Sequence, residues 1–441
     1  MTASTEVRTD AKTRRRGVLA AAVGTVVEYY DLTVYAYLAV VVSPLFFPGD
    51  DPTAALLASL AVFASAYFMR PIGGIVLGRI GDRHGRKRAL LLSVLLMGVG
   101  TLLMAFLPTY AMAGLLAPVL LVLARLVQGF SAGGELGGAL TYVYETVGRE
   151  RKGLGASFVA VGCNGGFALA AIAVGATAGL TTPEQMSAWG WRIPFLLGLP
   201  LLLFCLWTRT RIADTEEFAE QAEVARTPFR TVLRHHPKPL LQVFGLGLAQ
   251  NAGGYMVLTY IGIHLVRQGG YGQAAVAWTT AGVITVVALL MPVAGLLVDR
   301  FGSRRIVLAG LLLTAGAAYP ALALMSGHGL AVAAVAYLLF ALGTPLIQVG
   351  TAPLFPALFP TPVRLTGVAL AFNLATVAAG GTAAYIATWL ISATGNALSP
   401  AWFLVGACVL GLVALATVSR TQARGWPGRS RRARGRAGPR A

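Results

Sequence analysis

The sequence has little charge for its length, and that shortage decides its class. Only 12% of its 441 residues are charged, whereas 56% are hydrophobic. So few polar residues cannot cover the surface of a soluble core. The composition predicts an integral membrane protein.

Cysteine and catalytic motifs are equally scarce. The three cysteines, at positions 163, 205 and 408, lie far apart inside apolar runs, which argues against a disulfide framework or a metal site. No nucleophile–base–acid set, phosphate loop or nucleotide-binding motif is recognisable. We expect neither an enzyme nor a cofactor, and no ATP-driven pump.

Acidic residues number 17 against 35 basic ones, which gives a net charge of +18. The bases lie in loops between apolar runs, and no basic stripe alternates with aromatic residues. We therefore do not expect nucleic acid as a partner.

Apolar segments fill the chain from residue 18 onward. A bilayer core of about 30 Å requires roughly 20 helical residues for each crossing. Twelve segments meet this requirement, which predicts an all-α membrane protein. They are 18–42, 54–78, 89–107, 115–144, 153–179, 190–209, 238–266, 274–297, 305–325, 330–354, 365–391 and 400–419.

The loops between these segments alternate in charge. One set is basic, while the other set contains only Arg267 among lysines and arginines. Because cytoplasmic loops carry the excess of bases, both termini are predicted to be cytoplasmic, in a bacterial inner or plasma membrane. The basic start enters an apolar run without a convincing cleavage site, so the first span is expected to be retained.

Polar stretches divide the chain into five parts. The tail at the C-terminus is rich in Arg, Gly and Pro, and is expected to be drawn to anionic lipid headgroups. The predicted parts are a cytoplasmic tail (1–16), a six-helix bundle (17–209), a cytoplasmic linker (210–237), a second six-helix bundle (238–419) and a basic, disordered tail (420–441).

A glycine-rich basic loop occurs twice. GRIGDRHGRKR at 78–88 is matched in weaker form by GLLVDRFGSRR at 295–305. Its two aspartates, Asp82 and Asp299, are 299 − 82 = 217 residues apart, about half the chain. This period indicates two homologous halves.

The loop at 78–88 resembles the signature between the second and third helices of the major facilitator superfamily. Seven further motifs in order resemble its metabolite:proton symporter family, which includes citrate, 2-oxoglutarate, shikimate and proline/betaine carriers. The resemblance implies twelve helices in two pseudo-symmetric bundles and proton-coupled symport of a small carboxylate or zwitterion by alternating access. The motifs are EYYD (28–31), RPIGG (70–74), RLVQG (125–129), GGE (133–135), GWRIPF (190–195), FPTPVR (359–364) and GGT (380–382).

Alternatives are a proton-linked efflux antiporter of the same superfamily and a non-transporting receptor on the same fold. Residues 161–166 lack the Gly-Pro pair of many drug antiporters, which favours symport. Ser303 stands where the second loop copy usually has a base, which weakens a charge relay there. The tail lacks coiled-coil repeats, which disfavours an osmosensing betaine carrier. We expect a monomer.

Two acids lie in the middle of the first span. A carboxylate at the bilayer centre costs roughly 2.5–3.5 kcal/mol on insertion scales, so it requires a protein-lined cavity. Gly24, Glu28, Asp31 and Tyr35 follow helical spacing and share one face, which should point inward. We expect Glu28 and Asp31, with Glu135 of the fourth span, to be candidates for proton coupling.

The fourth span also offers Arg125 and Gln128. We expect Arg125 and Glu135 to be candidates for a cavity ion pair with the first helix, and an anionic solute to compete for Arg125. Arg70 and Arg192 are expected to be structural anchors, and His264 a helix-end residue. The resemblance implies that uncharged residues of the second half complete the cavity. The expected solute-binding residues are Tyr35, Arg125, Gln128, Asn251, Tyr255, Tyr260 and Asn373.

The resemblance also implies a cytoplasmic gate. In the superfamily the loop aspartate and arginine pair with an acid at the inner end of the fourth helix, here Glu145. Such contacts favour the outward-open state. The expected gate residues are Gly78, Asp82, Arg83, Gly85, Arg86, Glu145, Asp299 and Arg300.

Overall fold

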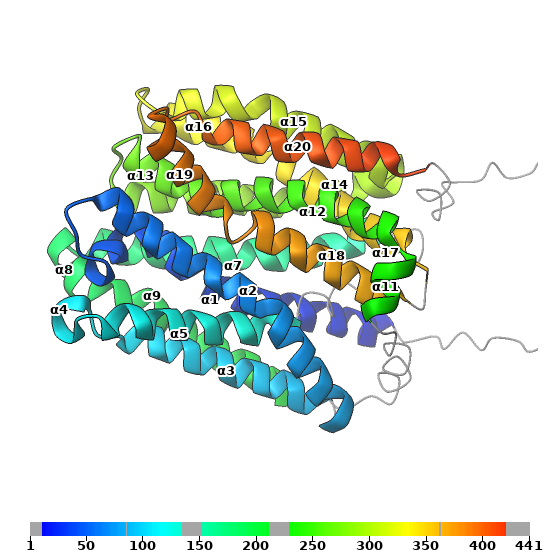
Figure 1. Ribbon diagram of the computed structural model, residues 1–441, viewed down its shortest axis with the longest axis horizontal. Helices are drawn as coiled ribbons and strands as arrows, with labels where there is room; N and C mark the ends of the chain where they lie inside the picture. Colours follow the sequence, from blue (N-terminus) through cyan, green and yellow to red (C-terminus); the bar gives the residue numbers. More distant parts are fainter. Residues whose placement is uncertain (1–10, 85, 135–151, 211–228, 361–362, 420–441) are drawn as a thin grey trace, which may run out of the picture.

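A computed structural model describes residues 11–84, 86–134, 152–210, 229–360 and 363–419. The described residues form a bundle of helices that run along the longest axis of the molecule (Figure 1). Ten helical segments, two of them made of two consecutive α-helices, are long and apolar enough to cross a membrane.

The first half supplies six crossings. Its fourth crossing is seen only as far as Gly134, so the remainder of the predicted 115–144 span lies outside the described residues. The elements are α1 (Ala11–Phe46), α2 (Pro52–His84), α3 (Arg86–Phe106), α4 (Tyr110–Ala113), α5 (Leu116–Ser131), η1 (Ala132–Gly134), α7 (Lys152–Leu180), α8 (Pro183–Ala188), η3 (Gly190–Arg192) and α9 (Ile193–Thr210).

The second half repeats the pattern after a short helix inside the predicted linker. Its elements are α11 (Phe229–His235), α12 (Pro237–Tyr255), η4 (Met256–Tyr260), α13 (Ile261–Arg267), α14 (Gln273–Phe301), α15 (Ser303–Met325), α16 (Leu330–Ala341), α17 (Gly343–Leu358), α18 (Arg364–Ala379), α19 (Ala383–Thr394) and α20 (Pro400–Thr417).

Two crossings complete the predicted twelve although they fall short as single apolar helices. One is α5 with η1, and the other is the continuous helical path α12–η4–α13. Two predicted spans that were expected to be continuous are each divided into two helices. The breaks lie at Leu342, between α16 and α17, and at 380–382, between α18 and α19.

The break at 380–382 has a physical cause. A Cβ atom on Gly381 would lie 2.3 Å from the ring of Tyr67, so only glycine lets this backbone approach α2. Gly380, with φ −89° and ψ −83°, has left the helical conformation. The glycine motif therefore brings the second half against the first half at the level of Tyr67.

The segment η4 is a single π-helical turn between α12 and α13. A π turn widens the helix and disturbs its regular hydrogen bonds. Tyr337 donates its hydroxyl to the carbonyl of Val257, and Tyr37 donates its hydroxyl to the carbonyl of Leu258 at 2.6 Å. One tyrosine from each half thus holds this turn.

The chain begins and ends on one side of the bundle. The start of α1 and the end of α20 lie there together with the α14–α15 junction, and we call this side the basic end (Figure 1). The side with α4, α8 and α13 is called the opposite end. Twelve crossings require this arrangement, because an even number returns the chain to the side on which it started.

Candidate functional site

Helix α1 carries the central polar residues toward the interior. Glu28 is 0% exposed, Asp31 2% and Tyr35 1%, and Gly24 is buried on the same face. The predicted inward face of the first span is therefore confirmed. The helix is buried there against α2, α3, α5 and α7.

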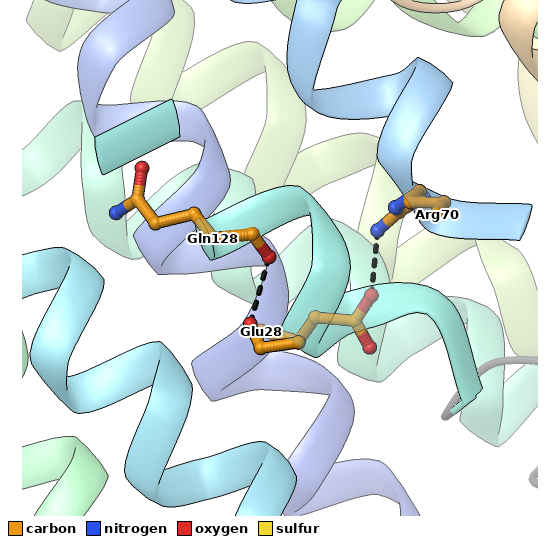
Figure 2. Close-up of polar contacts among 4 residues, drawn as sticks. Glu28, Arg70 and Gln128 are labelled. Carbon is orange, nitrogen blue, oxygen red and sulfur yellow. Dashed lines mark hydrogen bonds and ion pairs between the residues drawn. The ribbon is translucent and has the colours of Figure 1, made fainter. Parts of the chain in front are cut away.

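Glu28 forms a direct ion pair with Arg70 of α2. The distance from Arg70 Nη2 to Glu28 Oε1 is 2.5 Å, and Figure 2 shows the arginine reaching across to the carboxylate. The Arg70 guanidinium also lies over the rings of Tyr67, at 5.1 Å, and Tyr29, at 5.7 Å. Arg70 is only 5% exposed, so it does not snorkel to the membrane surface, and the expected structural anchoring takes the form of this buried ion pair. A buried arginine needs a carboxylate, and Glu28 supplies it.

Asp31 belongs to a different network. Its Oδ1 accepts the hydroxyl of Thr101 on α3, and its Oδ2 accepts Nε2 of Gln128 on α5 at 2.9 Å. The side-chain oxygen of Gln128 in turn accepts Nη1 of Arg125 at 2.9 Å. One neutral amide thus connects the carboxylate to a buried guanidinium.

Arg125 is the largest charged side chain that is fully buried, at 0% exposed. Its Nη1 also contacts the carbonyl of Leu32 at 3.4 Å, but its Nε and Nη2 have no hydrogen-bond partner among the described residues. Its guanidinium lies 4.9 Å from the ring centre of Tyr35 and 5.3 Å from that of Phe63. Buried donors without partners are costly, which makes Arg125 a candidate for binding an acceptor.

The expected pairing of the fourth span with the first helix is seen for Arg125 alone, because Glu135 lies outside the described residues. The hydrogen bonds of Arg125 are with the Gln128 amide and the Leu32 carbonyl. Gln128 therefore stands between Arg125 and Asp31, where the sequence predicted a direct ion pair.

Aromatic rings of both halves meet beside these arginines. Tyr67 and Tyr255 pack edge to face with centres 5.4 Å apart, and Phe167 of α7 approaches Tyr255 at 6.2 Å. Tyr255, on α12, is 6% exposed. It is the expected solute-binding residue of the second half that the structure brings nearest to the first-half network.

The other expected second-half residues bond within their own half. Asn251 donates to the Gly247 carbonyl one turn earlier on α12, and the Tyr260 hydroxyl lies 3.3 Å from Nδ1 of His264. Asn373 is half-buried on α18. His264 lies near the end of α13, as predicted, but is only 1% exposed.

Arg192 stays close to the predicted anchoring role. Its guanidinium donates to the carbonyls of Leu107, at 2.9 Å, and Ala188, at 3.0 Å, and lies 4.3 Å from the ring centre of Trp191. These contacts tie the start of α9 to the end of α3.

The second copy of the loop motif joins the two halves at the basic end. Asp299 accepts the backbone N–H groups of Gly153, at 2.8 Å, and Leu154, at 3.1 Å, in the first turn of α7. A Cβ on Gly295 would lie 2.9 Å from the Gly153 carbonyl oxygen, so the two backbones touch. Two backbone amides of α7 thus bind this carboxylate. A carboxylate at a helix N-terminus is favourable.

The rest of the expected gate is seen only in part. Gly78 is exposed on α2, and the Arg300 guanidinium lies 5.2 Å from the ring centre of Phe301. The side chains of Asp82, Arg83 and Arg86, and the residues Gly85 and Glu145, lie outside the described part of the chain.

The two halves touch at both ends and in the middle. At the opposite end, Gln273 Nε2 donates to the Tyr37 carbonyl at 2.9 Å, and Asp299 closes the basic end. Between them, the amides of Asn164 and Gln348 meet at 3.2 Å. Among the described residues, contacts thus join the two halves at both ends and in the middle.

Sequence comparison then decides the family. The profile described as Major Facilitator Superfamily matches residues 21–274, more than half of the chain. The chain belongs to the major facilitator superfamily. A profile described as sugar (and other) transporter covers residues 208–426.

Two curated superfamily relatives cover almost the whole chain. The glycine betaine/proline/ectoine/pipecolic acid transporter OusA of Dickeya dadantii is 34% identical over 90% of this chain and 82% of its own. The ectoine/proline transporter ProP of Corynebacterium glutamicum is 34% identical over 91% of this chain and 83% of its own. The predicted resemblance to the symporter family with proline/betaine carriers is confirmed.

The fold has a solved counterpart in the superfamily. A crystal structure of a D-xylose–proton symporter superposes with a TM-score of 0.72, covering 90% of this chain and 95% of its own at 20% identity. The predicted twelve-helix fold is therefore confirmed. The protein is a multi-pass membrane transporter and not an enzyme.

Proposed function

We propose that this protein carries a small zwitterionic solute together with a proton, with Arg125 binding the carboxylate of the solute and Asp31 carrying the proton. The observation that carries the proposal is the Arg125 guanidinium, which is fully buried and has two nitrogens without partners among the described residues. A carboxylate is the ligand that matches such a fork of donors.

The relatives support the zwitterionic class. Proline, glycine betaine, ectoine and pipecolic acid, the solutes in their names, each combine a carboxylate with a cationic nitrogen centre. Tyr67 and Tyr255 at the seam between the halves are the aromatic residues proposed to receive that cation.

Asp31 is connected to Arg125, the proposed carboxylate site, through the side-chain amide of Gln128. A solute carboxylate on Arg125 brings a second negative charge close to Asp31, and a proton on Asp31 relieves the repulsion. Solute and proton then favour each other's binding, and this coupling is reciprocal. Glu28 is held in a direct ion pair with Arg70, so we assign it a structural role. Glu135 remains a candidate for proton coupling.

The contacts between the two halves support transport by alternating access. The basic end, where bases crowd the loops, is proposed to face the cytoplasm of a bacterial cell, with both termini there. Release of Asp299 from α7 would open that end, and release of Tyr37 would open the other. Each chain builds its own site, so we propose that a monomer transports.

Uptake of labelled proline into proteoliposomes with the basic end inside tests the proposal. Under an inward proton gradient, the wild-type protein is expected to accumulate proline above equilibrium. Asp31→Asn is expected to lose accumulation but keep exchange across a gradient-free membrane, since it mimics the protonated acid. Arg125→Gln is expected to lose both activities.

The matched control is Glu184→Gln, which neutralises an exposed acid at the opposite end. It is expected to transport normally. Accumulation by Asp31→Asn at the wild-type level would refute its proton role, and transport by Arg125→Gln would refute carboxylate binding there. Uptake driven by an outward proton gradient would favour the antiporter.

A further inference from the structure

A polar pocket at the opposite end is not part of the central site. It lies on the seam between the halves, because its walls come from the start of α2, from η4 and α13, and from α19. Its polar lining residues are Thr53, Tyr260, His264, Arg267, Gln268, Thr388 and Ser392.

The pocket contains a buried hydroxyl without a partner. Thr388 is only 9% exposed, and its Oγ1 has no hydrogen-bond partner among the described residues. A buried hydroxyl that is left unsatisfied costs free energy until a partner bonds to it, and Thr388 lines this pocket. His264 forms a rigid wall, since its ring nitrogens lie 3.3 Å from the Tyr260 hydroxyl and 3.5 Å from that of Ser326.

The charge at the pocket suits a zwitterion better than a plain anion. Arg267 is exposed at the rim, and it is the only lysine or arginine in the loops of the opposite end. Asp50 and Asp51 immediately precede the lining segment of α2, and Asp51 accepts the backbone N–H of Thr53 at 2.7 Å. A bare anion is attracted by Arg267 but repelled by these acids, whereas a zwitterion satisfies both signs.

The pocket is connected to the central site along one face of α2. Leu56 lines the pocket, Ser59 on the next turn bonds to the Tyr35 hydroxyl at 2.8 Å, and Phe63 one turn further lies against Arg125. These residues are spaced by three and four positions, so they share a face of the helix. The pocket therefore lies at the outer end of the α2 face that packs against Tyr35 and Arg125.

We propose that this pocket is an outer binding site, in which Arg267 and Thr388 bind the carboxylate of a zwitterionic solute before it reaches Arg125. The assignment of the pocket to the extracellular side rests on the proposed function. The binding itself does not, because it requires neither a proton gradient nor the central site.

Site-directed labelling tests the outer site separately from transport. A reporter thiol is introduced by Ser392→Cys at the exposed rim; the native Cys163, Cys205 and Cys408 are all buried. The rate of its reaction with a membrane-impermeant thiol reagent is measured with and without glycine betaine. At about four times the dissociation constant, bound solute is expected to slow labelling roughly fivefold. Thr53→Cys provides a second reporter from the first half.

Three backgrounds assign the protection to this site. Arg125→Gln is expected to keep the protection, because the outer site does not need the central arginine. Arg267→Gln is expected to abolish it. The matched control Arg234→Gln removes an exposed arginine at the basic end and is expected to keep it. Choline, which has the same trimethylammonium group without the carboxylate, is expected not to protect.

Unchanged labelling with glycine betaine in every background would overturn the outer site. Protection that survives Arg267→Gln, disappears with Arg125→Gln or is equal with choline would overturn it as well. Failure of the proposed function has a separate signature. It would appear as proline uptake by Arg125→Gln in proteoliposomes, and the labelling result does not depend on it.

Discussion

The two halves share one fold but differ in what they bury. Among the residues that the structure describes, the buried acids and arginines are Glu28, Asp31, Arg70 and Arg125, and all four belong to the first half. The second half buries amides, hydroxyls and one histidine. Charged side chains inside a membrane are costly and mark functional sites. We therefore expect proton transfer and carboxylate binding to take place in the first half.

The relation is reversed at the basic end. There the second half supplies the carboxylate, Asp299, and the first half supplies backbone amides of α7 that bond to it. The second half thus contributes the Asp299 carboxylate to closure of the basic end, and uncharged side chains to the central site. The predictions that follow test this division of labour from the largest expected effect to the smallest.

Breaking the ion pair of the first half is expected to have the largest effect. Glu28→Gln leaves Arg70 buried without its carboxylate, which should cost about 3–5 kcal/mol in the free energy of unfolding. The double variant Glu28→Gln with Arg70→Met is expected to recover much of that loss. Thermal unfolding in detergent measures both, and a single variant as stable as the wild type would contradict the structural role of Glu28.

Matched threonines in the two halves are expected to respond differently. Thr101 bonds to the Asp31 carboxylate, whereas Thr351 bonds to the amide of Gln250 at 2.5 Å. A hydrogen bond to a charged group contributes about 1.5–3 kcal/mol, so Thr101→Val should lower the rate of coupled uptake about tenfold or more. Thr351→Val should change it by less than about threefold, because only a neutral bond is lost. Equal losses would show that both halves carry the coupling.

Asp299→Ala is expected to loosen the basic end. It removes the acceptor of two backbone N–H groups, worth about 1–3 kcal/mol, and should shift the population toward the state that is open there. Faster labelling of a Leu154→Cys thiol from that side measures the shift. Arg300→Gln is the control, since Arg300 packs on Phe301. Faster labelling in the control alone would contradict the role of Asp299 in closing the basic end.

The smallest effect is expected at the π turn. Tyr37→Phe and Tyr337→Phe each remove one hydroxyl, worth about 1 kcal/mol. Tyr37 reaches across from the first half, so its loss should favour opening of the opposite end and raise the labelling rate of Ser392→Cys a few-fold. Tyr337 lies within the second half, so its loss should lower thermal stability alone. Identical labelling rates would rule out this distinction.

The sequence predicted the fold and the inward face of α1, because both depend on periodic patterns along the chain. Apolar runs mark the crossings, and the spacing of Glu28, Asp31 and Tyr35 specifies one helical face. The partners of these residues were not predictable in the same way. Arg70 is 42 residues from Glu28 and Thr101 is 70 from Asp31, and only the packing of three helices brings them together.

Some signals were present but were given another meaning. An arginine inside the second span requires an acid, and Glu28 was available, yet Arg70 was interpreted as an anchor. The GGT motif at 380–382 was used as a family mark, although its glycines also indicate the break between α18 and α19. The π turn has no such mark, because Met256–Tyr260 is an ordinary apolar stretch. The five predicted parts of the chain, the solute-binding assignments and the lack of osmosensing remain predictions.

The contact between Gly153 and Gly295 has a consequence for leakage. A carrier that couples a solute to protons loses part of the proton gradient if protons cross while the solute site is closed. A single file of water molecules is enough to conduct them. Where main chain lies directly on main chain, with no side chain in between, there is no room for such a file. We expect a larger residue at either position to separate the two backbones here and to let protons leak through the carrier.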